Sequence, residues 1–282
     1  MTPSLRDAIG THQPLVAPSV YDGISALAAR EFGFAAVYIG SYATGATRYG
    51  VPDIGYLGVE DMADQVRRIA PLVEVPIIVD GEGGFGNPLH VARSVRLLER
   101  AGAAATHIED HEFGKHITAS PRVLSVSDAV DKIKAALDAR SSSDLMIIAR
   151  TDAAGSLGPD EALARAVAFQ EAGADAVFLA GYGISDEKAW RKLREVIDVP
   201  VVNTDFPSQS AQDAATAGVD VVLYYGLSHI AARASIRRVF RAIAETGSAP
   251  EEESSWSSVA EFDEFLGIAD ARAQARQYGL LD

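Results

Sequence analysis

The sequence predicts an α/β fold, a (β/α)8 TIM-type barrel, because short apolar runs alternate with amphipathic helical stretches along most of its 282 residues. Eight runs have the length and composition of buried strands: 15–17, 35–39, 76–79, 105–108, 145–149, 176–179, 199–202 and 221–225. Stretches such as 90–101, 127–139, 159–172 and 208–217 have helical periodicity. Such alternation builds a parallel sheet. The alternative to a closed barrel is a doubly wound open sheet.

A weak internal repeat supports the count of eight units. Before four of the runs the helix ends in a similar phrase: Glu31-Phe-Gly-Phe-Ala, Arg100-Ala-Gly-Ala-Ala, Glu171-Ala-Gly-Ala-Asp and Thr216-Ala-Gly-Val-Asp. We expect the glycine of each phrase to end its helix in the left-handed conformation, so that the next residues enter the strand directly.

Composition excludes several classes of protein. A net charge of −14 argues against nucleic acid and anionic membranes as partners. No apolar run approaches the roughly 20 residues of a membrane span. The polar stretch 1–13 lacks an apolar signal core, so we expect an intracellular, cytoplasmic protein. The absence of cysteine excludes disulfides, thiolate zinc sites and a cysteine nucleophile.

The chain changes character after Gly247. We therefore expect a barrel domain over residues 1–247 and a C-terminal region over 248–282, in which a polar, acidic linker (248–258) precedes one or two helices (259–281). Apolar residues in that region are Phe262, Phe265, Leu266 and Ile268. These helices either cap their own barrel or pack on a neighbouring subunit, which would make the protein a homo-oligomer.

Residues 80–86, Asp-Gly-Glu-Gly-Gly-Phe-Gly, are the most informative stretch. They follow an apolar strand, and strand alternation would point Asp80 and Glu82 the same way. Glycines around them leave room for a metal ion or an anionic substrate. The alternative is a polar turn whose acids are merely solvated.

The active site of a barrel lies at the carboxyl ends of its strands, and carboxylates are over-supplied there. Glu109, Asp110 and Asp152 follow two further strands, and Asn203 follows another as a candidate for binding substrate. A hard divalent ion, Mg²⁺ or Mn²⁺, would offset the repulsion among the acids. Arg150 suits a substrate carboxylate, its alternative being an internal ion pair with one of the acids.

The connection from Glu109 to Val126 is long for a loop of this kind, and we expect a lid that closes over substrate. Lys115 and His116 could supply a positive charge or a proton on closure. The alternative is that both are solvated loop residues.

The chain resembles members of the isocitrate lyase and phosphoenolpyruvate mutase superfamily over almost its whole length. The motifs that carry the resemblance are Tyr38-Ile-Gly-Ser41, Val51-Pro-Asp53-Ile-Gly, Val79-Asp-Gly-Glu-Gly-Gly-Phe-Gly-Asn87, Ile108-Glu-Asp110, Lys115, Ile148-Ala-Arg-Thr-Asp-Ala153 and Glu171-Ala-Gly-Ala-Asp175. The resemblance implies a tetramer in which pairs of subunits exchange their C-terminal helices.

The resemblance also implies the roles of individual residues. Asp80 would lie nearest Mg²⁺, with Asp53, Glu82 and Glu109 holding the ion partly through water. A second set would bind the carboxylate and carbonyl oxygens of substrate: Gly40, Ser41, Tyr42 and Arg150. The superfamily usually has Asp at the position of Glu82, so the inner shell of the metal could be rearranged.

Two departures bear on the activity. The lyases of the superfamily that cleave isocitrate, methylisocitrate and dimethylmalate carry a lid motif, Lys-Arg-Cys-Gly-His, whose cysteine is the acid/base; here the lid reads Lys115-His116-Ile117-Thr118. Those lyases also carry a glutamate after the sixth strand, where this chain has Ala180. Tyr38, His116 and His229 are the candidates to replace these groups.

We therefore expect a Mg²⁺-dependent lyase that acts through an enolate on a small anionic 2-oxo or 2-hydroxy dicarboxylate, similar to the oxaloacetate decarboxylase branch, which also lacks the cysteine and the glutamate. Two alternatives stay open at this point. One is a P–C bond enzyme of the phosphoenolpyruvate mutase or phosphonopyruvate hydrolase type. The other is a non-catalytic barrel that binds a dicarboxylate.

Overall fold

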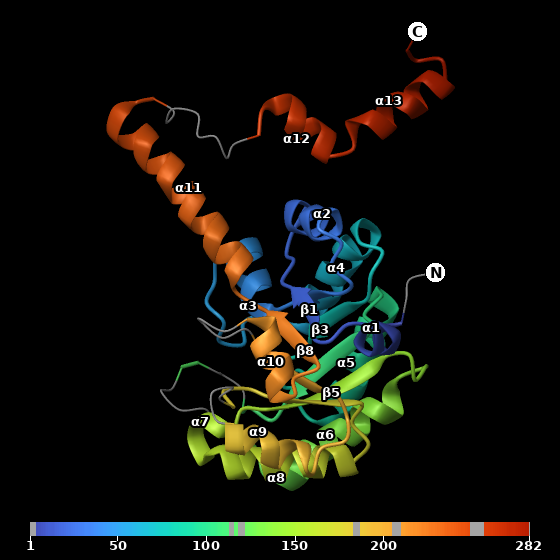
Figure 1. Ribbon diagram of the computed structural model, residues 1–282. Coiled ribbons are helices and arrows are strands. Elements are labelled where there is room, and N and C mark those ends of the chain that lie inside the picture. The colour runs from blue at the N-terminus through green and yellow to red at the C-terminus, as the bar shows by residue number, and fades with distance from the viewer. Residues whose placement is uncertain are drawn as a thin grey trace. The chain divides into compact units, whose positions relative to one another are not determined.

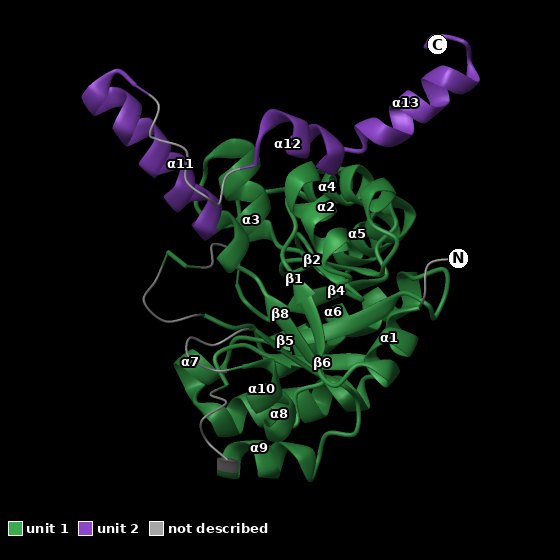
Figure 2. Cartoon of the chain, turned by 45° about the horizontal axis from the view of Figure 1, so that its top comes forward, with its two compact units in different colours: residues 1–229 green, residues 230–282 purple. Residues whose placement is uncertain are grey.

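The computed structural model describes residues 4–112, 116–117, 122–182, 187–204, 210–248 and 257–281. The chain divides into two compact units, residues 1–229 and 230–282 (Figure 2). The boundary lies inside a helix that follows the last strand, and the division into functional domains at residue 247 stays a prediction.

The first unit is a parallel eight-stranded barrel, as predicted (Figure 1). The strands are β1 (Leu15–Pro18), β2 (Val37–Ile39), β3 (Ile77–Asp80), β4 (Ala105–Glu109), β5 (Met146–Thr151), β6 (Ala176–Leu179), β7 (Val201–Thr204) and β8 (Val221–Tyr224). Sequential strands pair from β2 to β8, and β8 pairs with β1. A parallel bridge between Ser19 and Tyr38 links the remaining edges, so the open-sheet alternative is excluded.

Helices surround the strands (Figure 1). In the first unit they are α1 (Leu5–Thr11), α2 (Gly23–Glu31), α3 (Ser41–Thr44), η1 (Gly45–Tyr49), α4 (Val59–Ile69), η2 (Ala70–Leu72), α5 (Pro88–Ala101), α6 (Val126–Ala139), α7 (Ala154–Leu157), α8 (Pro159–Glu171), α9 (Glu187–Arg194) and α10 (Ala211–Ala217). The glycines of the four repeated phrases all have positive φ, between 68° and 107°, so the predicted helix stops are confirmed.

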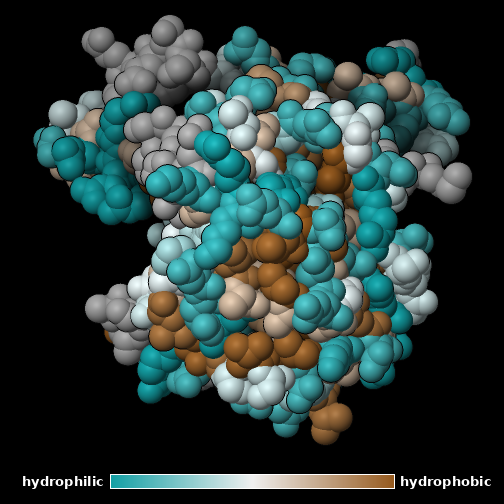
Figure 3. Space-filling model, turned by 60° about the horizontal axis from the view of Figure 1, so that its bottom comes forward, coloured by the Kyte–Doolittle hydropathy of each residue, from teal (hydrophilic) through white to brown (hydrophobic). Residues whose placement is uncertain are grey.

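Side-chain alternation along the strands creates two cores. One set of residues fills the barrel interior, including Leu15, Ile78, Met146 and Leu223. The opposite set packs between the strands and the helices around them. On the face shown in Figure 3, hydrophobic residues are grouped in the middle and hydrophilic residues lie around them.

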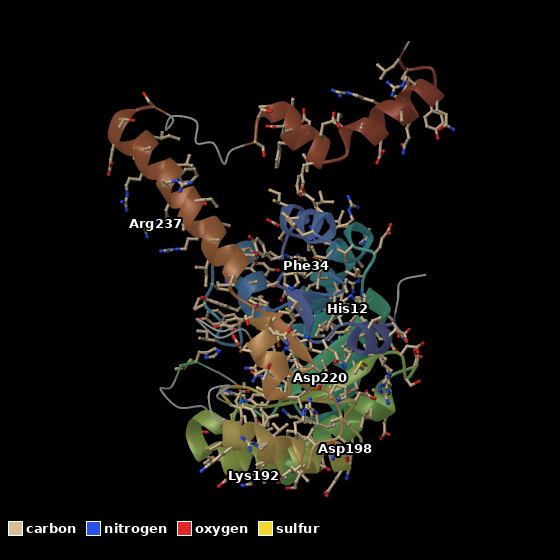
Figure 4. All side chains as sticks on the ribbon, in the orientation of Figure 1. His12, Phe34, Lys192, Asp198, Asp220 and Arg237 are labelled. Carbon is tan, nitrogen blue, oxygen red and sulfur yellow. The ribbon has the colours of Figure 1, made fainter. Side chains whose placement is uncertain are left out.

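The repeated phrases also explain two aspartates at strand entrances. Asp175 accepts a hydrogen bond from the backbone N–H of Ile147 (2.8 Å) and forms an ion pair with Arg140. Asp220, labelled in Figure 4, accepts one from Val201 N–H (2.7 Å) and pairs with Arg194. Each carboxylate thus joins its own strand to the neighbouring one, so the repeat is structural.

The second unit contains most of α11 (Leu227–Thr246), together with α12 (Val259–Phe265) and α13 (Ile268–Gln277). Two helices after the linker agree with the expectation for 259–281. None of its described residues is buried, and Phe262 and Leu266 are 39% and 53% exposed. A unit without a core of its own cannot offset the entropy of ordering its chain, so its apolar residues need a partner surface.

No helix in the described part of the chain is long and apolar enough to cross a membrane.

Gly81, the residue after β3, is expected to be needed for stability because its backbone lies against residues of β4. A Cβ added there would be 2.5 Å from the carbonyl oxygen of His107 and 2.6 Å from Thr106 Oγ1. We expect Gly81→Ala to lower the free energy of unfolding by about 2–3 kcal/mol, measured by urea denaturation. Gly83→Ala is the matched control, since its Cβ would meet nothing nearer than 3.4 Å. Equal stabilities of the two variants would contradict this account.

The second unit is expected to hold an oligomer together. Truncation after Gly247 removes α12, α13 and the apolar group around Phe262. We expect light scattering to report a smaller or aggregating species than the full chain gives at the same concentration. A truncated protein with an unchanged association state would show that this segment contributes nothing to assembly.

Candidate active site

A cavity of about 590 Å³ opens at the carboxyl ends of the strands. Its lining comes from most of the barrel: Tyr38, Gly40, Tyr42, Pro52, Asp53, Ile54, Asp80, His116, Arg150, Asp152, Phe178, Ala180, Thr204 and Tyr225. Alternation explains the choice, because Tyr38 and Phe178 belong to the set of residues that point into the barrel. The structure therefore brings seven predicted site residues to one cavity: Tyr38, Gly40, Tyr42, Asp53, Asp80, His116 and Arg150.

Ser41 joins two of the predicted metal ligands. Its hydroxyl lies 2.9 Å from Asp80 Oδ2 and 3.1 Å from Asp53 Oδ1, and its backbone N–H donates to Asp80 Oδ2 (3.2 Å). A hydroxyl carries one proton and can donate to only one carboxylate at a time. Two carboxylates therefore converge on one hydroxyl at the cavity wall.

This donor set fits a hard divalent cation. Carboxylate and hydroxyl oxygens are ligands that Mg²⁺ and Mn²⁺ prefer, and the chain has no thiolate to favour a softer metal. Among the described residues no three histidine or acidic side chains are grouped closely enough to hold an ion by themselves. Mg²⁺ usually keeps several waters, so a site with few protein ligands suits it.

Arg150 is buried and held on two sides. Its Nε and Nη2 donate to Asp152 (3.1 and 2.8 Å), and its Nη1 lies 3.3 Å from Glu109 Oε2. Burial alone would lower its pKa, but Asp152 and Glu109 raise that pKa well above its usual value. The predicted internal ion pair is therefore present. The two hydrogen bonds to Asp152 use two of the five N–H groups of the guanidinium, and the residue still lines the cavity.

Tyr38 and His107 form a buried pair that the sequence did not reveal. The Tyr38 hydroxyl lies 3.0 Å from His107 Nε2 and 3.4 Å from Asp80 Oδ2. His107 is two residues before Glu109 on β4, so alternation could have placed it inside the barrel. Phe178 was also missed, and its ring lies 5.0 Å from the Arg150 guanidinium.

Glu82 does not follow the expected alternation. β3 ends at Asp80, and Glu82 lies beyond it in a turn with a φ of +50°. Its backbone N–H donates to Asp80 Oδ1 (2.9 Å). Glu82 and Glu109 line a separate cavity of about 460 Å³, together with Lys132. The pKa of Lys132 is lowered by burial, an effect that nearby acids including Glu109 partly offset.

Of the remaining candidates, His116 lines the main cavity, whereas Asn203 and His229 are not among its lining residues. His116 lines the main cavity, 3.4 Å from Asp53 Oδ2, and Lys115 lies outside the described residues. Asn203 points the opposite way from the cavity-lining Thr204, and its amide donates to the Tyr182 carbonyl (3.4 Å). His229 packs edge-on against Tyr42 with its pKa lowered by burial, and is absent from the described lining.

Comparison with known proteins identifies the family. A model of the family described as phosphoenolpyruvate phosphomutase matches residues 5–244. The chain is 38% identical to 2,3-dimethylmalate lyase of Eubacterium barkeri over 196 residues, which are 68% of this chain and 67% of that protein. It is 42% identical to oxaloacetate decarboxylase of Rhodopseudomonas palustris (strain BisB5) over 167 residues, 58% of this chain and 57% of the relative.

A solved structure agrees with the sequence relatives. Phosphonopyruvate hydrolase in complex with oxalate and Mg²⁺ superposes with a TM-score of 0.86 at 30% identity, over 97% of each chain. The barrel, the polar cavity at its carboxyl end and these similarities lead to one conclusion: the chain belongs to the phosphoenolpyruvate phosphomutase family, within the isocitrate lyase and phosphoenolpyruvate mutase superfamily.

Proposed function

We propose that the protein is a Mg²⁺-dependent lyase that acts through an enolate on a small 2-oxo or 2-hydroxy dicarboxylate, with decarboxylation of the oxaloacetate type as the favoured reaction. The observation that carries the proposal is the joint placement, in one cavity, of Arg150 and of the Asp53–Asp80 pair that converges on Ser41. A cation and a metal-binding acidic group side by side suit a substrate with a carboxylate next to a polarised carbonyl.

Each residue has a role in this proposal. Asp80 would hold Mg²⁺, with Asp53, Glu82 and Glu109 contributing partly through water. When bound, the ion would act as a Lewis acid that stabilises the enolate oxygen. Arg150 would bind the substrate carboxylate, and the backbone around Gly40, Ser41 and Tyr42 would bind its other oxygens. Tyr38, Lys115 and His116 are the candidates to move a proton to the product.

Gly40 has a reason to be glycine at this place. A Cβ there would lie 2.9 Å from the ring of Tyr38. The backbone at Gly40 can therefore approach the Tyr38 ring closely, and both residues line the cavity.

The missing acid and base favour decarboxylation over aldol-type cleavage. Release of CO₂ requires a place for the electron pair but no base on a substrate hydroxyl, whereas cleavage of a 2-hydroxy acid needs both a base and an acid. Ala180 lines the cavity where a glutamate would be needed, and the chain has no cysteine. Similarity to oxaloacetate decarboxylase points the same way.

Activity is expected to require a divalent cation held by Asp80. With oxaloacetate as substrate and the metal-catalysed background subtracted, EDTA or Asp80→Ala should lower pyruvate formation at least about a thousandfold, equivalent to roughly 4 kcal/mol of transition-state stabilisation. Added Mg²⁺ should restore the EDTA-treated enzyme but not the variant. Asp64→Ala, which removes a carboxylate from the outer surface, is the control. Full turnover of metal-free protein would disprove the proposed site.

Cleavage of isocitrate and 2-methylisocitrate is expected to be negligible. A general acid or base typically contributes 10² to 10⁴-fold, and this chain lacks both groups used by those lyases. Succinate release, followed in the assay that measures pyruvate from oxaloacetate, should stay at background. A succinate-forming kcat within an order of magnitude of the typical ~10 s⁻¹ would show that another residue has taken the role.

The same assay separates the alternatives. Pyruvate and phosphate released from phosphonopyruvate, or phosphoenolpyruvate formed from it, would identify a P–C bond reaction, the alternative that the matching family model and the similarity to phosphonopyruvate hydrolase support. Binding of oxalate without turnover of any substrate would identify a non-catalytic barrel.

For the assembly we propose a homo-oligomer, most simply a tetramer.

A further inference from the structure

Asp110 is a buried residue next to the site, and its carboxylate is hydrogen-bonded to other residues of the barrel. It is 1% exposed at the end of β4. Its Oδ1 accepts a hydrogen bond from the Asp152 backbone N–H (2.9 Å), and its Oδ2 accepts one from Thr151 Oγ1 (2.7 Å). Burial raises the pKa of Asp110, and the hydrogen bonds from Asp152 and Thr151 oppose that rise. Asp110 thus fixes the backbone of Asp152, the residue whose carboxylate binds Arg150.

Arg165, from α8, supplies the opposite charge. It is 4% exposed, and its Nη1 donates both to Asp110 Oδ2 (3.0 Å) and to the carbonyl oxygen of Leu124 (2.8 Å). Leu124 in turn donates its backbone N–H to the Asp110 carbonyl oxygen (2.9 Å). One guanidinium therefore neutralises Asp110 and holds the segment by which the connection from β4 returns to the barrel.

These contacts form a continuous path to the cavity. Arg165 holds the Asp110 carboxylate, and Asp110 holds the backbone of Asp152. The Asp152 carboxylate binds Nε and Nη2 of Arg150, which fixes the plane of that guanidinium. A carboxylate whose backbone can shift would let this plane rotate, and a clamp displaced by about 1 Å can lose about a hundredfold in rate.

We propose that Arg165 and Asp110 are positioning residues, a buried ion pair that sets the orientation of Arg150 through Asp152 without touching substrate. The link from Arg165 to Arg150 stands on the geometry alone. Its consequence for ligand binding rests on the proposed function, in which Arg150 binds a carboxylate.

Arg165→Met tests this role with Glu161→Gln as the matched control. Methionine keeps much of the volume but removes the donors to Asp110 and Leu124. Glu161, on the same helix, accepts a hydrogen bond from Arg165 Nε (2.9 Å). The first measurement is exchange with water of the Arg150 Nε–H, followed in ¹⁵N NMR spectra and assigned with Arg150→Lys. The second is the dissociation constant for oxalate in the presence of Mg²⁺. Both are made well below the melting temperature of each variant.

We expect Arg165→Met to accelerate Nε–H exchange of Arg150 at least about tenfold and to weaken oxalate binding at least about tenfold, which corresponds to about 1.4 kcal/mol. Glu161→Gln should stay within about twofold of the unmodified protein in both measurements. A purely structural role of Arg165 would lower the melting temperature and leave the exchange unchanged, and that result would overturn the proposal.

Two further arms keep the outcome decisive. If Arg165→Met does not fold, Arg165→Lys replaces it, since lysine retains the charge but not the planar fork that serves two acceptors; unchanged Nε–H exchange in that variant overturns the proposal equally. If the unmodified protein does not bind oxalate, the proposed binding of a dicarboxylate substrate, and with it the proposed function, is contradicted. The exchange measurement still decides the positioning role in that case.

Discussion

The ion pairing of Arg150 is the interaction on which the rest of the site depends. A buried guanidinium is tolerated only where carboxylates compensate its charge, and here Asp152 binds it through two parallel hydrogen bonds while Glu109 lies at its other end. Removal of Asp152 would take away both hydrogen bonds to the guanidinium and one of the carboxylates that raise its pKa. The arrangement makes Arg150 a fixed cation at the cavity wall, so a bound anion would not have to order it first.

Close approach of the backbone is the second constraint. Gly81 lies against the carbonyl oxygen of His107, and Gly40 lies against the ring of Tyr38. Glu82 and Phe85 adopt left-handed backbone conformations, with φ values of +50° and +61°, which cost energy in residues that carry a side chain. Such strain is common near functional sites, and the glycine-rich turn after β3 concentrates it beside Asp80.

The two units differ in how they are stabilised. In the barrel, residues are buried both in its interior and between the strands and the surrounding helices. Asp175 and Asp220, just before β6 and β8, join each of these strands to its neighbour. Residues 230–282 include no buried position within their described part. The hydrophobic effect can stabilise such a segment only through contact with another surface.

The sequence by itself determined the architecture and the neighbourhood of the site. Period-two and helical patterns, helix-ending glycines and carboxylates after strands are local features, so the eight strands, the helix stops and the strand-end positions of Asp80 and Arg150 followed without coordinates. Asp53 was expected only from the resemblance to the superfamily. Even the internal ion pair of Arg150 was foreseen as an alternative. The absence of cysteine bore on the chemistry in the same direct way.

Only the tertiary structure decided which of these groups face one another. Whether a strand ends at Asp80 or continues to Glu82 depends on packing against β4, and that single point moved Glu82 to a different cavity. His107 and Arg165 come from segments 69 and 55 residues distant from their partners Tyr38 and Asp110. Such contacts depend on how the barrel closes and how α8 packs, and no local pattern records them because the energies that select them arise only when the elements meet.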